Sequence, residues 1–165
     1  MNVFAWAYLG GLVGAALMDI TESVVARMGI TSGVRVALLG RWVAGFAKGQ
    51  LAHPDIRRAE VHPAEVRLGW AFHYLVAGGG VALVYPVLME LLNWPIQSYP
   101  LSSGLLFGVA TSVLPWFVLL PLFGWGVWGR RGPVGSNALL ASVLSHVPYG
   151  FGVAATILVG IDGRA

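Results

Sequence analysis

The chain has no cysteine, and charged side chains are scarce in it. The absence of cysteine excludes disulfide bonds, thiolate metal sites and cysteine nucleophiles. Only 10% of the 165 residues are charged, whereas about 25% are charged in an ordinary soluble domain. Hydrophobic residues make up 57%, and the mean hydropathy is +0.75. These values predict an integral membrane protein. They also indicate that the isoelectric point near 9.7 reflects membrane topology rather than binding to nucleic acid.

Four segments are apolar over a length that can cross a bilayer. A helix needs about 20 residues to do so, and backbone groups in lipid must form hydrogen bonds within their own segment. The first segment has no basic leading region, so we expect a retained membrane helix rather than a signal peptide. The sequence therefore predicts an all-α, integral membrane four-helix bundle in a single domain, residues 1–165, with spans at about 3–25, 66–92, 101–127 and 137–161.

The basic residues fall almost entirely on one side of these spans. Of the ten, only Arg164 lies with the termini, and nine lie in or beside the first and third connections. The positive-inside rule therefore places the connection at about 27–65 in the cytoplasm and both termini on the periplasmic side of a bacterial inner membrane. Trp70, Trp125 and Trp128 would then lie at the inner interface. The nine are Arg27, Arg35, Arg41, Lys48, Arg57, Arg58, Arg67, Arg130 and Arg131.

The long first connection contains an apolar stretch, GVRVALLGRWVAGFAKG, at residues 33–49. Its spaced basic residues predict an amphipathic helix in the cytoplasmic interface between the first two spans, with a re-entrant segment as the rival interpretation. Two His-Pro pairs follow, at His53 and His62, and we expect short helices to begin there. For His53, His62 and Asp55, helix capping is favoured over metal binding.

Small residues predict close helix packing. Gly10 and Gly14 form a GxxxG pair, as do Gly104 and Gly108. Such faces bring helices of the same chain together, or they dock the helices of a partner.

Ionisable side chains also occur inside the predicted spans, where they are costly and usually functional. Asp19 and Glu22 are three residues apart and share one helix face. Glu65 and His73 share a face of the second span, and His146 lies on a polar stripe of the fourth. By depth, these residues can meet in the cytoplasmic half of the bundle, and Arg41 or His53 could close the site. The predicted ligand-binding residues are thus Asp19, Glu22, Arg41, Glu65, His73 and His146.

The residue types leave several chemistries open. Asp19, His53, His73 and His146 suit a divalent metal such as iron, manganese or zinc. His73 and His146 could instead be the axial ligands of a haem, although this is less favoured. Carboxylates and imidazoles also suit a proton relay. Structural roles weigh nearly equally: the carboxylates could be an interfacial pair at a helix end, and the histidines could fix helix packing.

The order of several short motifs resembles a family of bacterial membrane proteins known only as a domain of unknown function. The motifs include Met18–Asp19, "GRW" at 40–42, "GW" at 69–70, "HY" at 73–74, "PWF" at 115–117, "GWG" at 124–126 and "SH" at 145–146, with Arg27, Gly49, His53, Ile56, Glu65 and Pro121 between them. The resemblance covers nearly the whole chain and implies a small multi-helix inner-membrane protein. It implies no activity, and Glu22 has no counterpart in the pattern.

Two functions are compatible with these observations. The leading one is a transporter or sensor whose buried carboxylate–histidine site binds a metal ion, a proton or a small polar ligand. The alternative is an accessory or assembly subunit of a larger membrane complex or a homo-oligomer, whose motif residues serve packing or pigment and haem contacts. A membrane enzyme ranks lower, because no nucleophile aligned with a base is evident.

Overall fold

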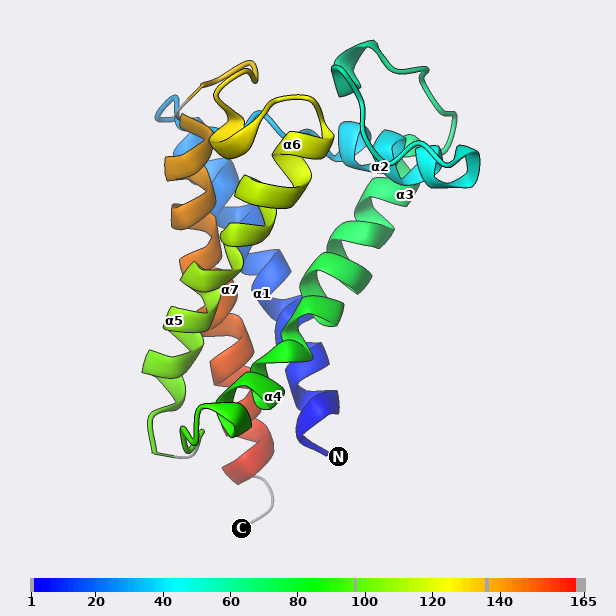
Figure 1. Ribbon diagram of the computed structural model, residues 1–165. Coiled ribbons are helices and arrows are strands. Elements are labelled where there is room, and N and C mark those ends of the chain that lie inside the picture. Colours follow the sequence, from blue (N-terminus) through cyan, green and yellow to red (C-terminus); the bar gives the residue numbers. More distant parts are fainter. Residues whose placement is uncertain (1, 97, 136, 163–165) are drawn as a thin grey trace. The chain divides into compact units, whose positions relative to one another are not determined.

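The computed structural model describes residues 2–96, 98–135 and 137–162, and every regular element in them is helical (Figure 1). This confirms the predicted all-α fold. Three short 3-10 helices, Phe46–Lys48, Ile56–Arg58 and Val127–Gly129, and two π-helical stretches, Phe72–Gly80 and Pro115–Leu119, accompany the α-helices. The α-helices are α1 (Val3–Ala26), α2 (Val36–Gly45), α3 (Glu65–Ala71), α4 (Val84–Leu91), α5 (Pro100–Thr111), α6 (Leu120–Leu122) and α7 (Asn137–Asp162).

Among the described residues, four continuous helical segments are long and apolar enough to cross a membrane. They are Val3–Ala26, Glu65–Leu91, Pro100–Leu122 and Asn137–Gly160, with mean hydropathies between 1.5 and 2.0. Three of them agree with the predicted spans to within one residue at each end. Many of their large apolar side chains are exposed, Leu75, Leu106 and Val159 among them. Such side chains are stable in lipid rather than water, so the natural surroundings of these helices are a bilayer.

The third span ends five residues earlier than its hydropathy predicts, at Leu122 rather than Val127. The residues that follow are apolar, but Gly124 and Gly126 have φ angles of +82° and +72°. This left-handed backbone cannot continue a right-handed helix. Gly124 also lies against the backbone of Pro54, where a Cβ would collide with the Pro54 carbonyl oxygen. The chain therefore turns here, at a contact with the first connection.

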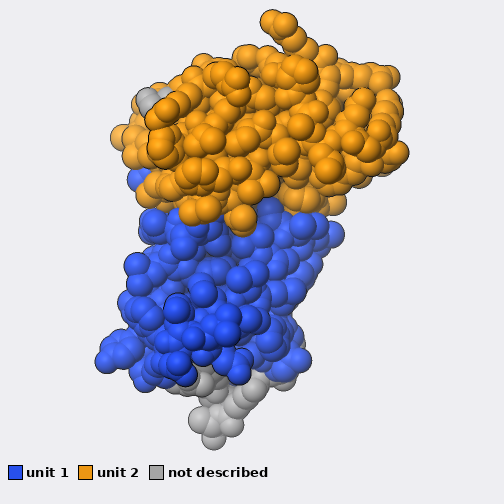
Figure 2. Space-filling model, viewed as in Figure 1, with its two compact units in different colours: residues 1–21, 74–111, 144–165 blue, residues 22–73, 112–143 orange. Residues whose placement is uncertain are grey.

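The chain forms two compact units, and each is built from separate parts of the sequence (Figure 2). Unit 1 comprises residues 1–21, 74–111 and 144–165, of which 2–21, 74–96, 98–111 and 144–162 are described. Unit 2 comprises residues 22–73 and 112–143, described except for 136. Each unit has its own apolar core, and the single domain expected from the sequence stays a prediction.

Unit 1 is held together by close contacts at glycines. Gly10 and Gly14 of α1 lie against Val153 and Tyr149 of α7. Gly104 and Gly108 of α5 lie against Gly150 of α7. A Cβ at any of these four glycines would approach backbone atoms of α7 to 2.9 Å or less. The predicted GxxxG faces thus pack helices of this chain against one another. They therefore give no evidence that helices of a partner protein dock there.

Unit 2 is built on the crossing of α2 and α3. A Cβ at Gly40 would collide with the backbone of Glu65 and Gly69, and one at Gly69 would collide with the carbonyl group of Val36. The two helices therefore approach at backbone distance. The stretch predicted as an interfacial helix is α2, extended by the 3-10 turn Phe46–Lys48.

Trp125 was predicted at the membrane interface, and the structure corrects this. Its side chain is only 1% exposed, it packs edge-on against Phe123 with ring centroids 5.4 Å apart, and its indole Nε1 donates to Asp55 Oδ1 at 3.3 Å. Trp70 is 43% exposed, as an interfacial residue would be. Trp125 is instead a core residue of unit 2, because the turn at Gly124 directs it inwards. This core consists of Leu38, Leu39, Trp42, Ile56, Leu120, Phe123, Trp125 and Ala138.

Candidate functional site

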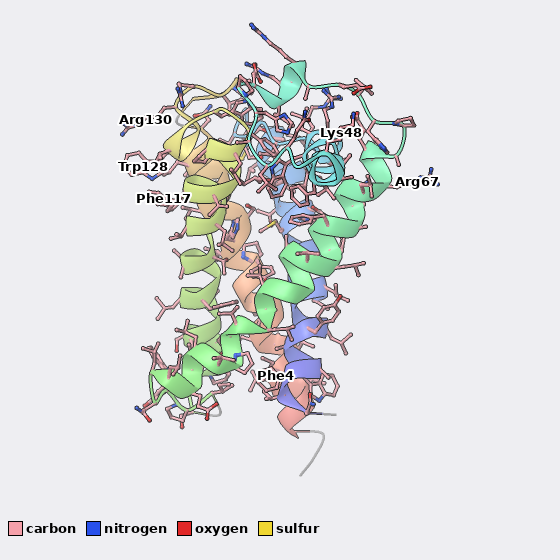
Figure 3. The ribbon with its side chains drawn as sticks, turned by 45° about the vertical axis from the view of Figure 1, so that its right-hand side comes forward. Phe4, Lys48, Arg67, Phe117, Trp128 and Arg130 are labelled. Carbon is pink, nitrogen blue, oxygen red and sulfur yellow. The ribbon has the colours of Figure 1, made fainter. Side chains whose placement is uncertain are left out.

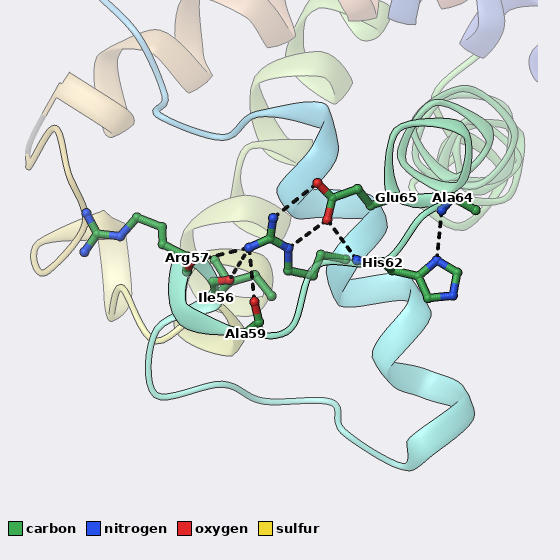
Figure 4. A network of polar contacts seen from close by, with 7 residues as sticks. Ile56, Arg57, Ala59, His62, Ala64 and Glu65 are labelled. Carbon is green, nitrogen blue, oxygen red and sulfur yellow. Dashed lines mark hydrogen bonds and ion pairs between the residues drawn. The ribbon is translucent and has the colours of Figure 1, made fainter.

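Two of the predicted site residues, Arg41 and Glu65, form an ion pair where α2 crosses α3. Arg41 Nε donates to Glu65 Oε2 at 2.8 Å, and Arg41 Nη2 donates to Glu65 Oε1 at 3.2 Å (Figure 4). The two side chains are only 11% and 13% exposed. A two-point contact between a guanidinium and a carboxylate is the strongest form of this interaction. The glycine contacts at Gly40 and Gly69 bring the helices near enough for it.

The remaining nitrogen of Arg41 binds the connection that joins α2 to α3. Arg41 Nη1 donates to the carbonyl oxygens of Ile56, Arg57 and Ala59 at 3.4, 3.4 and 3.3 Å (Figure 4). The indole of the next residue, Trp42, donates to the carbonyl oxygen of Leu51 at 2.7 Å. One segment of α2 thus satisfies backbone carbonyls of a loop that has little regular structure of its own.

The same loop is also fixed to the end of the third span. The backbone N–H of His53 donates to the carbonyl oxygen of Leu122 at 2.8 Å, and that of Ile56 donates to Phe123 at 3.0 Å. Ile56 is fully buried in the core of unit 2. The loop is therefore an integral part of unit 2.

Asp55 has the capping role that the sequence predicts, whereas His62 does not cap a helix. Asp55 Oδ1 accepts from the backbone N–H of Arg57 at 3.1 Å at the start of the Ile56–Arg58 turn. The Arg57 side chain binds the same carboxylate at 2.7 to 3.1 Å, and it holds the pKa of Asp55 well below its ordinary value. Ahead of α3, His62 Nδ1 accepts from the backbone N–H of Ala64 at 3.1 Å, but Ala64 is itself the N-cap residue and α3 has no side-chain cap.

A pocket of about 100 Å³ opens between α2 and this loop. Basic side chains predominate around it, with Glu60 the acidic member of its lining. Lys48 donates to Glu60 at 2.8 Å, and this contact lowers the pKa of the Glu60 carboxyl. The polar lining residues are Arg41, Lys48, Gln50, His53, Glu60 and His62.

His53 is distinctive among the residues that line the pocket. Its Nε2 atom is buried, and within the described part of the chain it has no hydrogen-bond partner. Gly45 of α2 lies next to that nitrogen, since a Cβ there would be 3.5 Å from it. Buried polar atoms are almost always satisfied, so an exception calls for an explanation. The His53 imidazole keeps hydrogen-bonding capacity at the wall of a charged pocket.

Unit 1 contains a second polar cluster, inside the membrane spans. Asp19 Oδ2 accepts from the hydroxyl of Tyr74 at 2.7 Å. Tyr149 is 2% exposed, and its hydroxyl donates to the carbonyl oxygen of Gly78 at 2.7 Å. Both Tyr74 and Gly78 belong to the π-helical stretch Phe72–Gly80. A π-helix departs from the regular i→i−4 ladder, and such stretches are frequent at functional sites.

The other predicted site residues lie on these same spans. Glu22 is partly exposed on α1. His73 packs against Trp70 with ring centroids 5.9 Å apart, and His146 packs against Tyr149 at 6.3 Å. Among the residues that the structure describes, no group of three or more histidine, aspartate or glutamate side chains could hold a metal ion. The metal site predicted from Asp19, His53, His73 and His146 therefore gains no support.

Sequence reasoning did not identify Tyr74 and Tyr149 as the hydroxyl donors, nor Lys48 and Glu60 as part of a pocket. A signal existed for the tyrosines, because Tyr149 belongs to the polar stripe of the fourth span and Tyr74 follows His73 directly. The pocket gave no such signal, since its residues lie on a loop whose path depends on the contacts of Arg41 and Trp42.

Long apolar helices, tight glycine crossings and polar side chains within the spans define a helical membrane protein that crosses the bilayer several times. The sequence profile of the family described as "Protein of unknown function (DUF2938)" matches residues 9–159, and the chain belongs to this family. This confirms the resemblance drawn from the motifs. No curated protein and no solved structure matches the chain.

Proposed function

We propose that this protein binds a small polar anion at the membrane surface, in the pocket between α2 and the loop that follows it, as a sensor or a transporter would. The buried Nε2 of His53 carries the proposal, because it is a directed hydrogen-bonding group in the pocket wall. A pocket of about 100 Å³ has room for a small ion such as phosphate or a short carboxylate.

The charges around the pocket favour an anion. Four basic side chains, those of Arg41, Lys48, His53 and His62, line it with one carboxylate, that of Glu60. Glu65 offsets Arg41, and Glu60 offsets Lys48. Among the described residues, neither of the two histidines forms an ion pair with a carboxylate, so both remain to bind an anion.

Calorimetric titration of the detergent-purified protein with inorganic phosphate tests the proposal. We expect saturable binding. His53→Ala should weaken it about tenfold, the effect of losing one hydrogen bond to a charged group. Lys48→Ala, at an exposed pocket position, should also weaken it. Arg58→Ala is the matched control, because Arg58 is an exposed cation of the same loop outside the pocket lining. Equal losses in the control, or no saturable binding of the wild type, would refute the assignment.

The pocket would face the cytoplasm under the topology that we propose, with both termini on the periplasmic side of a bacterial inner membrane. The asymmetry of the basic residues supports this orientation. Because the chain has no cysteine, single cysteines can be introduced without background. With a membrane-impermeant maleimide applied to intact cells, Ser98→Cys should be labelled and Ala47→Cys should be labelled only after lysis. The reverse pattern would invert the topology.

A further inference from the structure

We propose that Arg130 and Trp128 form a binding site for the headgroup of an anionic phospholipid, at the end of the third span. The site is separate from the anion pocket, because neither residue lines that pocket. Four observations on unit 2 support it.

The first observation is the stacking of a guanidinium on an indole. The Cζ atom of Arg130 lies 4.5 Å from the centre of the Trp128 ring. This distance is well within the range of a cation–π interaction. Stacking fixes the plane of the guanidinium and leaves its N–H groups at the edges free to bind, and these groups match the oxygens of a phosphate.

The second observation is that Arg130 has no acidic partner. Within the described residues, neither Arg130 nor its neighbour Arg131 forms an ion pair with a carboxylate, and both are exposed. By contrast, the carboxylates of Glu65, Glu60 and Asp55 are bound by Arg41, Lys48 and Arg57. Two adjacent uncompensated cations attract an anion.

The third observation is the backbone of Trp128, which has φ 59° and ψ 15°. This left-handed conformation is rare for a bulky side chain. Such conformations persist only where the surroundings determine them, and they gather at functional sites. Here the strained backbone places the indole between Arg130 and Phe117, whose ring centre is 6.1 Å from that of Trp128.

The fourth observation is the position of these side chains along the chain. Phe117 lies within the third span, which ends at Leu122, and Trp128 and Arg130 follow that end. Figure 3 shows the three side chains one after another along the same side of the ribbon. The order from apolar ring to indole to guanidinium matches the order from acyl chain to interface to phosphate in a lipid leaflet. The occupant that fits is therefore an anionic phospholipid.

Native mass spectrometry of the full chain in detergent, titrated with phosphatidylglycerol or with phosphatidylcholine of the same acyl chains, tests this site. We expect phosphatidylglycerol to bind preferentially and saturably to the wild type. Arg130→Ala should weaken that binding about fivefold, the typical effect of one cation close to an anionic lipid. Arg67→Ala is the matched control, because Arg67 is also an exposed arginine near a span end and is not stacked on an aromatic ring among the described contacts.

Trp128→Gly is a second variant, which removes the ring that positions Arg130 but should leave the fold intact. Glycine adopts the left-handed backbone without strain, so the turn should be retained while the stacking surface is lost. We expect thermal stability to be preserved and the preference for phosphatidylglycerol to fall about as far as in Arg130→Ala. His53→Ala should leave lipid binding unchanged. Equal binding of the two lipids by the wild type, equal losses in Arg130→Ala and Arg67→Ala, or an unchanged preference in Trp128→Gly would each overturn the proposal.

Discussion

Arg41 and Glu65, 24 residues apart in the sequence, are joined by two hydrogen bonds of 2.8 and 3.2 Å at the crossing of α2 and α3. Removal of either partner leaves the other charge poorly solvated and unpaired. We expect Arg41→Ala or Glu65→Gln to lower the free energy of unfolding of unit 2 by about 1–3 kcal/mol, between the cost of breaking an exposed pair and that of breaking a fully buried one. Thermal unfolding in detergent measures this.

Lys48→Ala is the control for that prediction. Lys48 and Glu60 also form an ion pair at 2.8 Å, but their side chains are 61% and 81% exposed. Exposed pairs contribute about 0–1 kcal/mol, so this variant should unfold close to the wild-type temperature. If Arg41→Ala behaved in the same way, the pair of Arg41 and Glu65 would have no structural role.

Gly11 and Gly80 should respond in opposite ways to substitution by alanine. A Cβ at Gly11 would collide with the carbonyl group of Gly78, whereas the nearest atom to a Cβ at Gly80 is 3.4 Å away. Gly11→Ala should destabilise unit 1 by about 1–3 kcal/mol through overpacking. Gly80→Ala should stabilise it by about 0.5–1 kcal/mol, since glycine is costly inside a helix. The unfolding temperatures of the two variants test this prediction. A shift of the same sign in both would contradict the close packing at Gly11 and the open space at Gly80.

Tyr149→Phe tests the hydrogen bond to the π-helical stretch. The carbonyl oxygen of Gly78 would lose the hydroxyl that donates to it at 2.7 Å in a buried setting. We expect a loss of about 1–3 kcal/mol, the cost of leaving a buried acceptor unsatisfied. Hydrogen exchange of amides in the stretch 72–80 should also accelerate. A variant as stable as the wild type would show that the carbonyl finds another donor.

The stability of unit 2 should fall in acid because of Asp55. Arg57 holds the pKa of this carboxyl below its ordinary value of 3.8. A group whose pKa is lowered on folding stabilises the fold above its unfolded pKa, and that stability is lost as the pH falls below it. The unfolding temperature should therefore drop between about pH 5 and pH 3. Asp55→Asn, which can still cap the turn, should show a shallower decline. An identical decline would assign the acid sensitivity to other groups.

The sequence predicts most of the membrane architecture, because hydropathy and helix length are local properties. Gly10, Gly14, Gly104 and Gly108 also fulfil the predicted role, since small residues at that spacing are selected by close approach of helices. The end of the third span was misplaced, because hydropathy does not register the left-handed backbone at Gly124 and Gly126.

The candidate site was predicted less completely. Residue type and depth identified Arg41, Glu65, His53 and Asp19 as polar residues of interest. They did not identify the partners, because the contacts of Arg41 with Glu65 and of Asp19 with Tyr74 depend on helix crossings and rotations that a single sequence does not encode locally. The π-helical stretch Phe72–Gly80 was also missed, since its composition is that of an ordinary apolar helix.

The contacts of Arg41 with the loop have a consequence for proteolysis. Arg57 and Arg58 are exposed basic residues and would ordinarily be good sites for trypsin. The carbonyl group that trypsin must attack after Arg57 is, however, held by Arg41 Nη1, and those of Ile56 and Ala59 are held by the same nitrogen. A protease needs this backbone in an extended and accessible form. Cleavage at Arg57 would therefore require the release of Arg41 first. The rate of cleavage by trypsin then measures how often the crossing of α2 and α3 opens.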